Sequence, residues 1–178
     1  MKDPNRNEKV YLFFSYDLSL HMTANAVHPS YSYAENGRIA SSAGAVFAEM
    51  GYFVIPQRAS LGLRAGIHVT SYFRTHSQPI VFTARYFMSE SRNSFFLFAE
   101  AGLIRRVENF DILFHEDFHN GRIGALGFGR KLFYTNKLAA LVSIGYNFYH
   151  VSFSKSSPAQ SDFFLKTNGL DFKIGFFF

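Results

Sequence analysis

The sequence predicts an all-β fold: an eight-stranded antiparallel up-and-down transmembrane β-barrel. First, apolar and polar residues alternate with a period of two in eight segments, which is typical of strands with two different faces. Second, 48% of the 178 residues are hydrophobic and 19% are aromatic, yet the mean hydropathy is −0.02, so apolar residues are interleaved with polar ones. Third, no run approaches the roughly 18 consecutive apolar residues that a membrane-spanning helix requires.

The first predicted strand begins near Lys9 and keeps its alternation to Thr23. Its apolar face consists of Leu12, Phe14, Tyr16, Leu18, Leu20 and Met22. Its other face consists of Phe13, Ser15, Asp17, Ser19, His21 and Thr23. One such strand does not distinguish a lipid-facing surface from the core face of a soluble sheet.

Six further segments repeat this pattern before the C-terminal strand. The second to fifth strands are predicted at 46–54, 61–74, 80–89 and 95–106, and the seventh at 138–149. The sixth, at 122–132, contains Gly124, Gly127 and Gly129, which leave its phase open and predict a bulge. The last strand covers 169–178 and ends on outward Phe176 and Phe178. An amphipathic strand that ends on an aromatic residue resembles the insertion signal of bacterial outer-membrane barrels.

The connections between these strands predict the orientation of the barrel, because bacterial barrels have short periplasmic turns and longer external loops. The connections centred on Pro56, Glu90 and Thr135 are short. Those at 24–37, 107–119 and 153–166 are long, and only the one near Ser77 is short on that side. Both termini are therefore predicted to be periplasmic, with residues 9–178 as one barrel domain. Residues 1–8 contain no apolar segment that would serve as a signal peptide, and we expect them to form a periplasmic extension.

Aromatic residues near predicted strand ends suggest a girdle at the lipid headgroups. They are Tyr11, Tyr52, Phe73, Tyr86, Phe133 and Phe148. Strand propensity alone also explains aromatic residues at these positions.

The inward faces predict a network of charges in the lumen. Its members are Asp17, Glu49, Arg64, His68, Arg85, Glu100, Asp171 and Lys173. A bare charge in a narrow interior is costly, so we expect Glu49 to pair with Arg64 or His68, Arg85 with Glu100, and Asp17 with Lys173. An eight-stranded barrel is just wide enough for side chains to fill, and inward phenylalanines would plug it further: Phe47, Phe53, Phe96 and Phe98.

Composition excludes several other classes of site. The absence of cysteine excludes disulfides and thiolate zinc sites and suits an oxidising compartment. The net charge of +5 is scattered, which argues against nucleic acid as a partner. His115 and His119 flank Glu116 and Asp117, but in a predicted loop, whereas a zinc protease pair lies on one helical face. We therefore predict no metal and no cofactor.

Four segments resemble the small outer-membrane barrel proteins of Bacteroidetes. They are 79–87 (PIVFTARYF), 96–102 (FLFAEAG), the glycine-rich 121–133, and 175–178 (GFFF), and the resemblance covers most of residues 40–178. It implies a Gram-negative outer membrane, with lipid and lipopolysaccharide as surroundings, but no particular activity.

The segment 146–152 (YNFYHVS), with Asp171 farther along, looks like the end of lipid A deacylase barrels. That resemblance implies Ser152 as nucleophile, His150 as base and Asp171 as orienting acid. Two departures weaken this resemblance. The family has an asparagine directly after the serine, which helps to stabilise the oxyanion, whereas this chain has Phe153 there. The alternation of the last strand also places Asp171 on the inward face.

The sequence thus favours a non-enzymatic barrel with a plugged lumen, an accessory or structural subunit of a larger outer-membrane assembly. Long loops such as 24–37 and 110–118 would carry partner contacts. The alternatives are a lipid A or phospholipid acyl hydrolase using His150 and Ser152, a small-solute channel, and a soluble lipocalin-like barrel.

Overall fold

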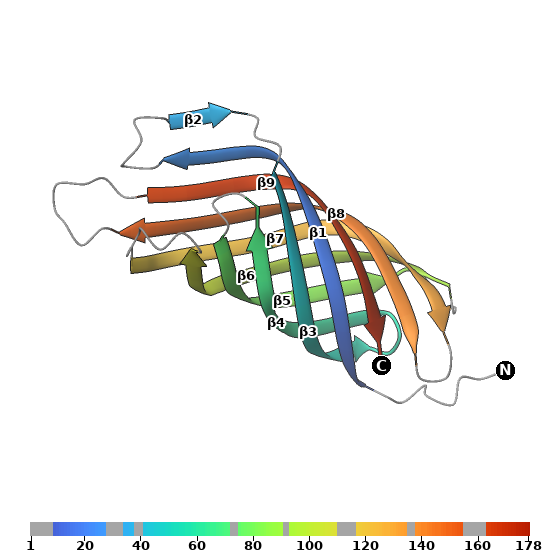
Figure 1. Cartoon of the computed structure of the whole chain (residues 1–178). Helices are drawn as coiled ribbons and strands as arrows, with labels where there is room; N and C mark the ends of the chain where they lie inside the picture. The colour runs from blue at the N-terminus through green and yellow to red at the C-terminus, as the bar shows by residue number, and fades with distance from the viewer. Residues whose placement is uncertain are drawn as a thin grey trace.

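The computed structural model describes residues 9–27, 34–37, 41–71, 75–90, 93–109, 117–134, 138–154 and 163–178. Its strands are β1 (Val10–Val27), β2 (Ala34–Gly37), β3 (Ser41–Ile55), β4 (Ala59–Thr70), β5 (Thr75–Phe87), β6 (Phe95–Asn109), β7 (Asp117–Tyr134), β8 (Ala139–Ser154) and β9 (Phe163–Phe177). Every neighbouring pair is antiparallel; β3 to β9 follow one another in chain order, β1 lies beside β3, and β2 pairs with β1 (Figure 1). No helix in the described part of the chain is long and apolar enough to cross a membrane.

The sheet closes on itself because β1 pairs with both β3 and β9. The closing ladder runs from Phe13 opposite Phe177 to Val27 opposite Phe164. The short β2 continues the line of β3 along β1, since Gly37 lies opposite Ala24 and Ser41 opposite His21. The molecule is therefore a closed barrel of eight antiparallel strands, as the alternation predicted.

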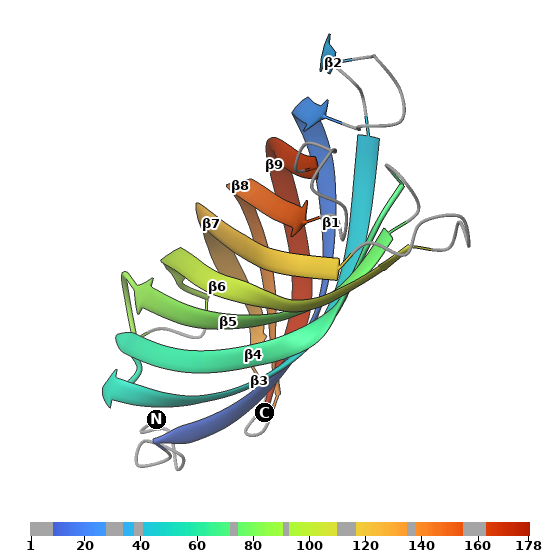
Figure 2. The same ribbon diagram turned by 90° about the vertical axis from the view of Figure 1, so that its left-hand side faces the viewer.

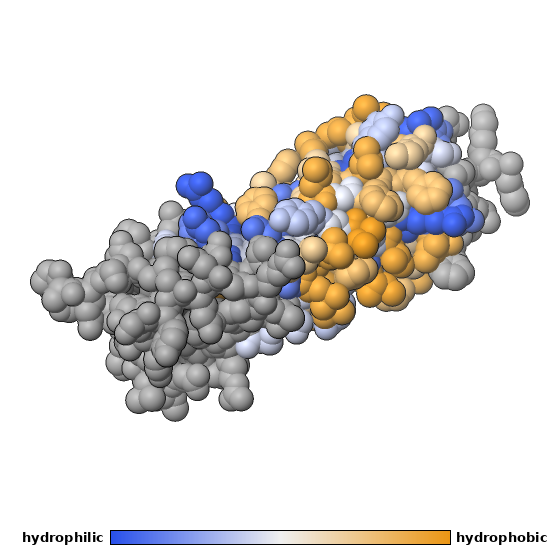
Figure 3. Space-filling view, turned by 90° about the horizontal axis from the view of Figure 1, so that it is seen from above, coloured by the Kyte–Doolittle hydropathy of each residue, from blue (hydrophilic) through white to orange (hydrophobic). Residues whose placement is uncertain are grey.

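The two faces of the wall have opposite chemistry. Outward side chains such as Met50 (65% exposed) and Leu126 (67%) are apolar. Inward side chains include charged groups such as Arg64, which is 1% exposed. A soluble protein buries its apolar face, so the lipocalin-like alternative is wrong. An apolar belt around a polar, filled interior is the arrangement of a membrane-spanning barrel, and Figure 3 shows this belt between more hydrophilic ends.

Connections of different kinds gather at the two ends of the barrel (Figure 2). β1 begins and β9 ends at the same end, where Leu12 and Phe178 exchange backbone hydrogen bonds. At this terminal end β3, β5 and β7 also end, and β4, β6 and β8 begin. At the opposite, distal end β1, β4, β6 and β8 end. In the sequence, the intervals between strands that meet at the distal end are 28–40, 71–74, 110–116 and 155–162, against 56–58, 88–94 and 135–138 at the terminal end. The predicted loops were too long. β1 continues to Val27, β6 to Asn109 and β8 to Ser154, while β7 begins at Asp117 and β9 at Phe163. Ser77 lies within β5 rather than in a turn.

Two local predictions need correction. β7 does contain register shifts, one of them between Lys131 and Phe133 at the end of the predicted strand, but none lies at Gly124, Gly127 or Gly129, where the ladder to β8 is regular. Tyr11 does not belong to a headgroup girdle, because it points into the lumen and is 2% exposed. Tyr52, Tyr86 and Phe148 do lie on the outer face.

The wall is interrupted at one place between β4 and β5. Pairing passes from Ala65 opposite Ile80 directly to His68 opposite Ser77. Pro79 lies in this gap and has no N–H to donate to a ladder. An open crevice of about 670 Å³ results on the outer wall, with Arg105 of β6 at its edge.

Candidate functional site: lumen and outer rim

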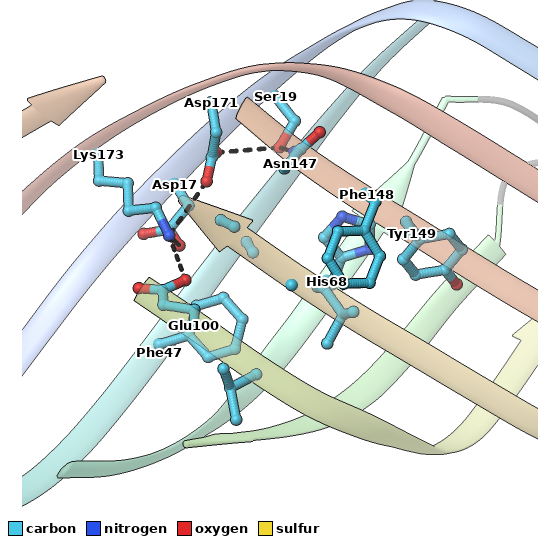
Figure 4. A pocket seen from close by; sticks show the side chains of 15 residues that line it. Asp17, Ser19, Phe47, His68, Glu100, Asn147, Phe148, Tyr149, Asp171 and Lys173 are labelled. Atoms are coloured by element: carbon cyan, nitrogen blue, oxygen red, sulfur yellow. Dashed lines mark hydrogen bonds and ion pairs between the residues drawn. The ribbon is translucent and has the colours of Figure 1, made fainter. Parts of the chain in front are cut away.

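A chain of ion pairs crosses the middle of the lumen. Arg64 of β4 contacts the carboxylate of Asp17 on β1 and donates from Nη1 to Oε1 of Glu100 on β6 at 2.7 Å. Lys173 of β9 completes the circuit, contacting Glu100 and lying 3.5 Å from Asp17 (Figure 4). All four side chains are at most 7% exposed. The chain joins four separate strands and so braces the barrel across its width.

Asp171 extends this cluster toward the distal end. Its Oδ2 lies 3.1 Å from Nζ of Lys173, and its Oδ1 accepts a hydrogen bond from Ser19 at 3.1 Å. Ser19 in turn accepts a hydrogen bond from Nδ2 of Asn147 at 2.7 Å (Figure 4). Asp171 is thus occupied by lumen partners.

A second charged cluster lies nearer the terminal end. Arg85 of β5 donates to the carboxylate of Glu49 on β3 from both terminal guanidinium nitrogens, Nη1 at 2.5 Å and Nη2 at 2.7 Å. Tyr11 and Thr83 donate to the same carboxylate at 2.8 and 3.0 Å. Four donors around one buried carboxylate offset much of its desolvation.

Gly62 of β4 makes the contact between Glu49 and Arg85 possible, because β4 separates their strands. A Cβ on Gly62 would overlap Oε1 of Glu49 and lie 2.8 Å from Oγ1 of Thr83. The missing side chain leaves the space through which Glu49 reaches across β4. A glycine inside a strand where another group approaches closely is the signal that marks this site in the sequence.

Two of the predicted pairings are wrong, although their residues do line the lumen. Glu49 lies directly opposite Arg64 in the ladder, yet it binds Arg85, and Glu100 binds Arg64 and Lys173. The predicted pair of Asp17 and Lys173 does form. The physical reason is that strands in a barrel are tilted and the lumen is narrow, so a long side chain reaches partners beyond its neighbouring strand.

His68 does not pair with Glu49 either. It is buried and stacks on Tyr149, with ring centroids 4.9 Å apart. Its ladder position is opposite Ala45, away from Glu49 toward the distal end. His68 therefore lines the lumen beside the charge network (Figure 4).

Aromatic rings close the lumen on the terminal side of the charges. The cluster consists of Tyr11, Phe13, Phe53, Phe87, Phe96, Phe98 and Phe177, with Leu141 and Ala125. Tyr11 stacks on Phe177 at 4.4 Å. Phe47 lies apart from this cluster, beneath the guanidinium of Arg64 at 3.6 Å.

The space left around these side chains is small. Two cavities, of about 20 and 10 Å³, lie beside the charge network. The larger has room for about one water molecule. Among the described residues, these side chains leave no space for a hydrated solute.

The three hydrolase candidates are not brought together. His150 and Ser152 alternate with buried Val151 and face outward near the distal end of β8, while Asp171 points into the lumen. A Ser-His-Asp mechanism needs the acid hydrogen-bonded to the histidine, and the wall separates them here.

The described residues contain no group of three or more candidate metal ligands. Of the histidine pair considered above, His115 and its neighbour Glu116 lie outside the described residues. The outward terminal residues Phe176 and Phe178 sit where the insertion signal was predicted, with Phe178 in edge contact with Phe14.

Comparison with known proteins supports the architecture. No family model matches the sequence, and no curated protein matches it. Among solved structures, the outer membrane protein OprG from Pseudomonas aeruginosa aligns with a TM-score of 0.54. The alignment covers 95% of this chain and 94% of that one at 11% identity. The fold is that of an outer-membrane β-barrel.

Proposed function

We propose that the protein is a non-enzymatic outer-membrane barrel, an accessory or structural subunit of a larger outer-membrane assembly. The observation that carries this proposal is the filled lumen, in which three cations and four carboxylates bind one another above an aromatic layer. A barrel that conducts nothing along its axis acts through its lipid-facing wall and its connections.

The proposed location is the bacterial outer membrane, with both termini in the periplasm and the distal end outside. The fold of OprG and the longer distal connections support this orientation. A host among the Bacteroidetes stays a prediction. An epitope tag at the N-terminus of the mature chain, which leaves the C-terminal Phe178 unaltered, should be inaccessible to antibody on intact cells and accessible after lysis.

Extraction from native membranes in mild detergent, followed by size-exclusion chromatography and mass spectrometry, tests the subunit proposal. We expect the barrel to migrate with larger outer-membrane proteins in fixed proportion. Migration alone, as a single chain in a micelle, would contradict it.

Planar bilayers should show no discrete conductance, and stepwise openings would contradict the closed lumen.

Acyl hydrolysis at His150 and Ser152 is the second candidate, favoured by the outward position of both residues on one strand face. Lipid A incubated with the protein, with Ser152→Ala and without protein would be compared by mass spectrometry. Loss of an acyl chain with the unaltered protein alone would support a hydrolase and overturn the non-enzymatic proposal. Identical spectra in the three samples would end the hydrolase candidate.

A further inference from the structure

Three basic residues form a row on the outer face near the distal end. Arg122 of β7 lies directly opposite His150 of β8, and His150 lies directly opposite Lys166 of β9. Arg122 and Lys166 are exposed and His150 is partly exposed. Directly opposed residues are about 5 Å apart, so the three backbone positions fall within about 10 Å. Their side chains are long enough to converge on one anionic group.

The row is part of a longer series of basic residues on one side of the barrel. Arg105, exposed on β6, extends it to a fourth consecutive strand, one outward position beyond Leu103, which is opposite Arg122. Across the closing ladder, Lys166 lies opposite Asn25 of β1, and the outward residues described near the distal ends of β3 and β4 include Ser42 and Val69, which are uncharged. We call Arg105, Arg122, His150 and Lys166 the basic arc.

The arc lies at the edge of the apolar belt. Along β8, outward Tyr146 and Phe148 precede His150, and along β9, outward Lys166 and Asn168 precede Leu170. Figure 3 shows hydrophilic residues at the edges of the apolar belt on the face in view. A cation directly above lipid-facing aromatic side chains sits at headgroup depth, where lipid phosphates lie.

We propose that the basic arc binds the phosphate groups of a lipid A glycolipid in the outer leaflet. Arg122, His150 and Lys166 lie directly opposite one another on neighbouring strands, so an anion placed between them is attracted by each of the cations. A lipid is the ligand that the position favours, because its acyl chains would lie on the apolar belt below while its phosphates meet the arc. This inference rests on the proposed orientation, which places the distal end at the outer leaflet.

The test is retention of lipid by the purified full chain in mild detergent, measured by native mass spectrometry. Lipid A bearing its phosphates, the same lipid A enzymatically dephosphorylated, and phosphatidylglycerol are the probes. The Arg122→Gln and Lys166→Gln double variant should retain phosphorylated lipid A about 25-fold less, because each basic residue near an anionic headgroup contributes about fivefold.

Arg130→Gln is the matched control, because Arg130 is also outward on β7 but lies at the terminal end, over the ring of Phe95 at 5.3 Å. It should retain lipid A as the unaltered protein does. The charge-conserving Arg122→Lys and Lys166→Arg double variant should also retain it. Heat-modifiable migration in SDS gels shows that each variant is folded.

Three results would overturn the proposal: equal retention by the glutamine double variant, equal retention of dephosphorylated lipid A, and an equal loss of phosphatidylglycerol binding. The last would make the arc a general attractor of anionic lipid. Because retention in detergent depends neither on a partner protein nor on orientation, its failure is distinguishable from failure of the subunit proposal.

Discussion

The charges inside the barrel and those at its outer rim differ in what can reach them. In the lumen, Arg64, Arg85 and Lys173 each contact a carboxylate of the same chain and are buried. At the rim, Arg122 and Lys166 flank His150 on the outer face, where Arg122 and Lys166 are exposed and His150 is partly exposed. The inner set contacts only groups of its own chain and therefore braces the barrel. The outer set is open to groups of the membrane.

Replacing Arg64, the cation at the centre of the lumen network, should lower the stability of the barrel more than any other change considered. Arg64→Ala leaves Asp17 and Glu100 without their main cation in a closed lumen. We expect the free energy of unfolding to fall by about 3–5 kcal/mol. Guanidinium chloride unfolding in phospholipid vesicles, followed by circular dichroism, measures it. Arg130→Ala, an exposed cation at the wall, should cost less than about 1 kcal/mol, and equal losses in the two variants would contradict the comparison.

The pair of Glu49 and Arg85 should be strongly coupled. Glu49→Gln or Arg85→Met alone leaves one buried charge with too few partners, whereas the double variant removes both charges. In a double-mutant cycle of unfolding free energies we expect a coupling of about 2–3 kcal/mol. If the losses in unfolding free energy of the two single variants are additive, Glu49 and Arg85 are not specifically coupled, and each is stabilised equally well by the other charged cluster in the lumen.

Gly62→Ala tests whether the ion pair of Glu49 and Arg85 requires the space that the missing side chain of Gly62 leaves on β4. The added methyl overlaps the Glu49 carboxylate, so Glu49 must withdraw from Arg85, and unfolding free energy should fall by about 1–3 kcal/mol. Gly44→Ala is the control, since its Cβ would lie 3.2 Å from the hydroxyl of exposed Tyr16, which can turn away. An alanine at 62 that is tolerated as well as one at 44 would refute the requirement.

The rim should matter least for stability. Without lipid A, the Arg122→Gln and Lys166→Gln double variant should unfold within about 0.5 kcal/mol of the unaltered protein, because exposed positions contribute little. The same unfolding measurement with phosphorylated lipid A added should separate the two proteins. A large loss without lipid would assign the arc to the fold itself.

Much of the fold was predictable because a period of two assigns each residue to one face of the wall. Asp17 and Lys173 were expected to meet, and they do, since they are direct neighbours in the closing ladder. Arg64 and Glu49 are also direct neighbours, yet they bind elsewhere. Tyr11, Thr83 and Asn147 were not foreseen as partners, because their contacts depend on depth in the lumen.

Alternation along the chain by itself determined the barrel, its two faces and the inward position of Asp171, since inward and outward are properties of single strands. Only the tertiary structure decided which inward groups meet, which outward cations align, and that the wall separates Asp171 from His150. The tilt of the strands and the closure of the barrel set how deep in the lumen each side chain lies. Because the lumen is narrow, side chains at the same depth contact one another even when they are not neighbours in the sequence or in the ladder.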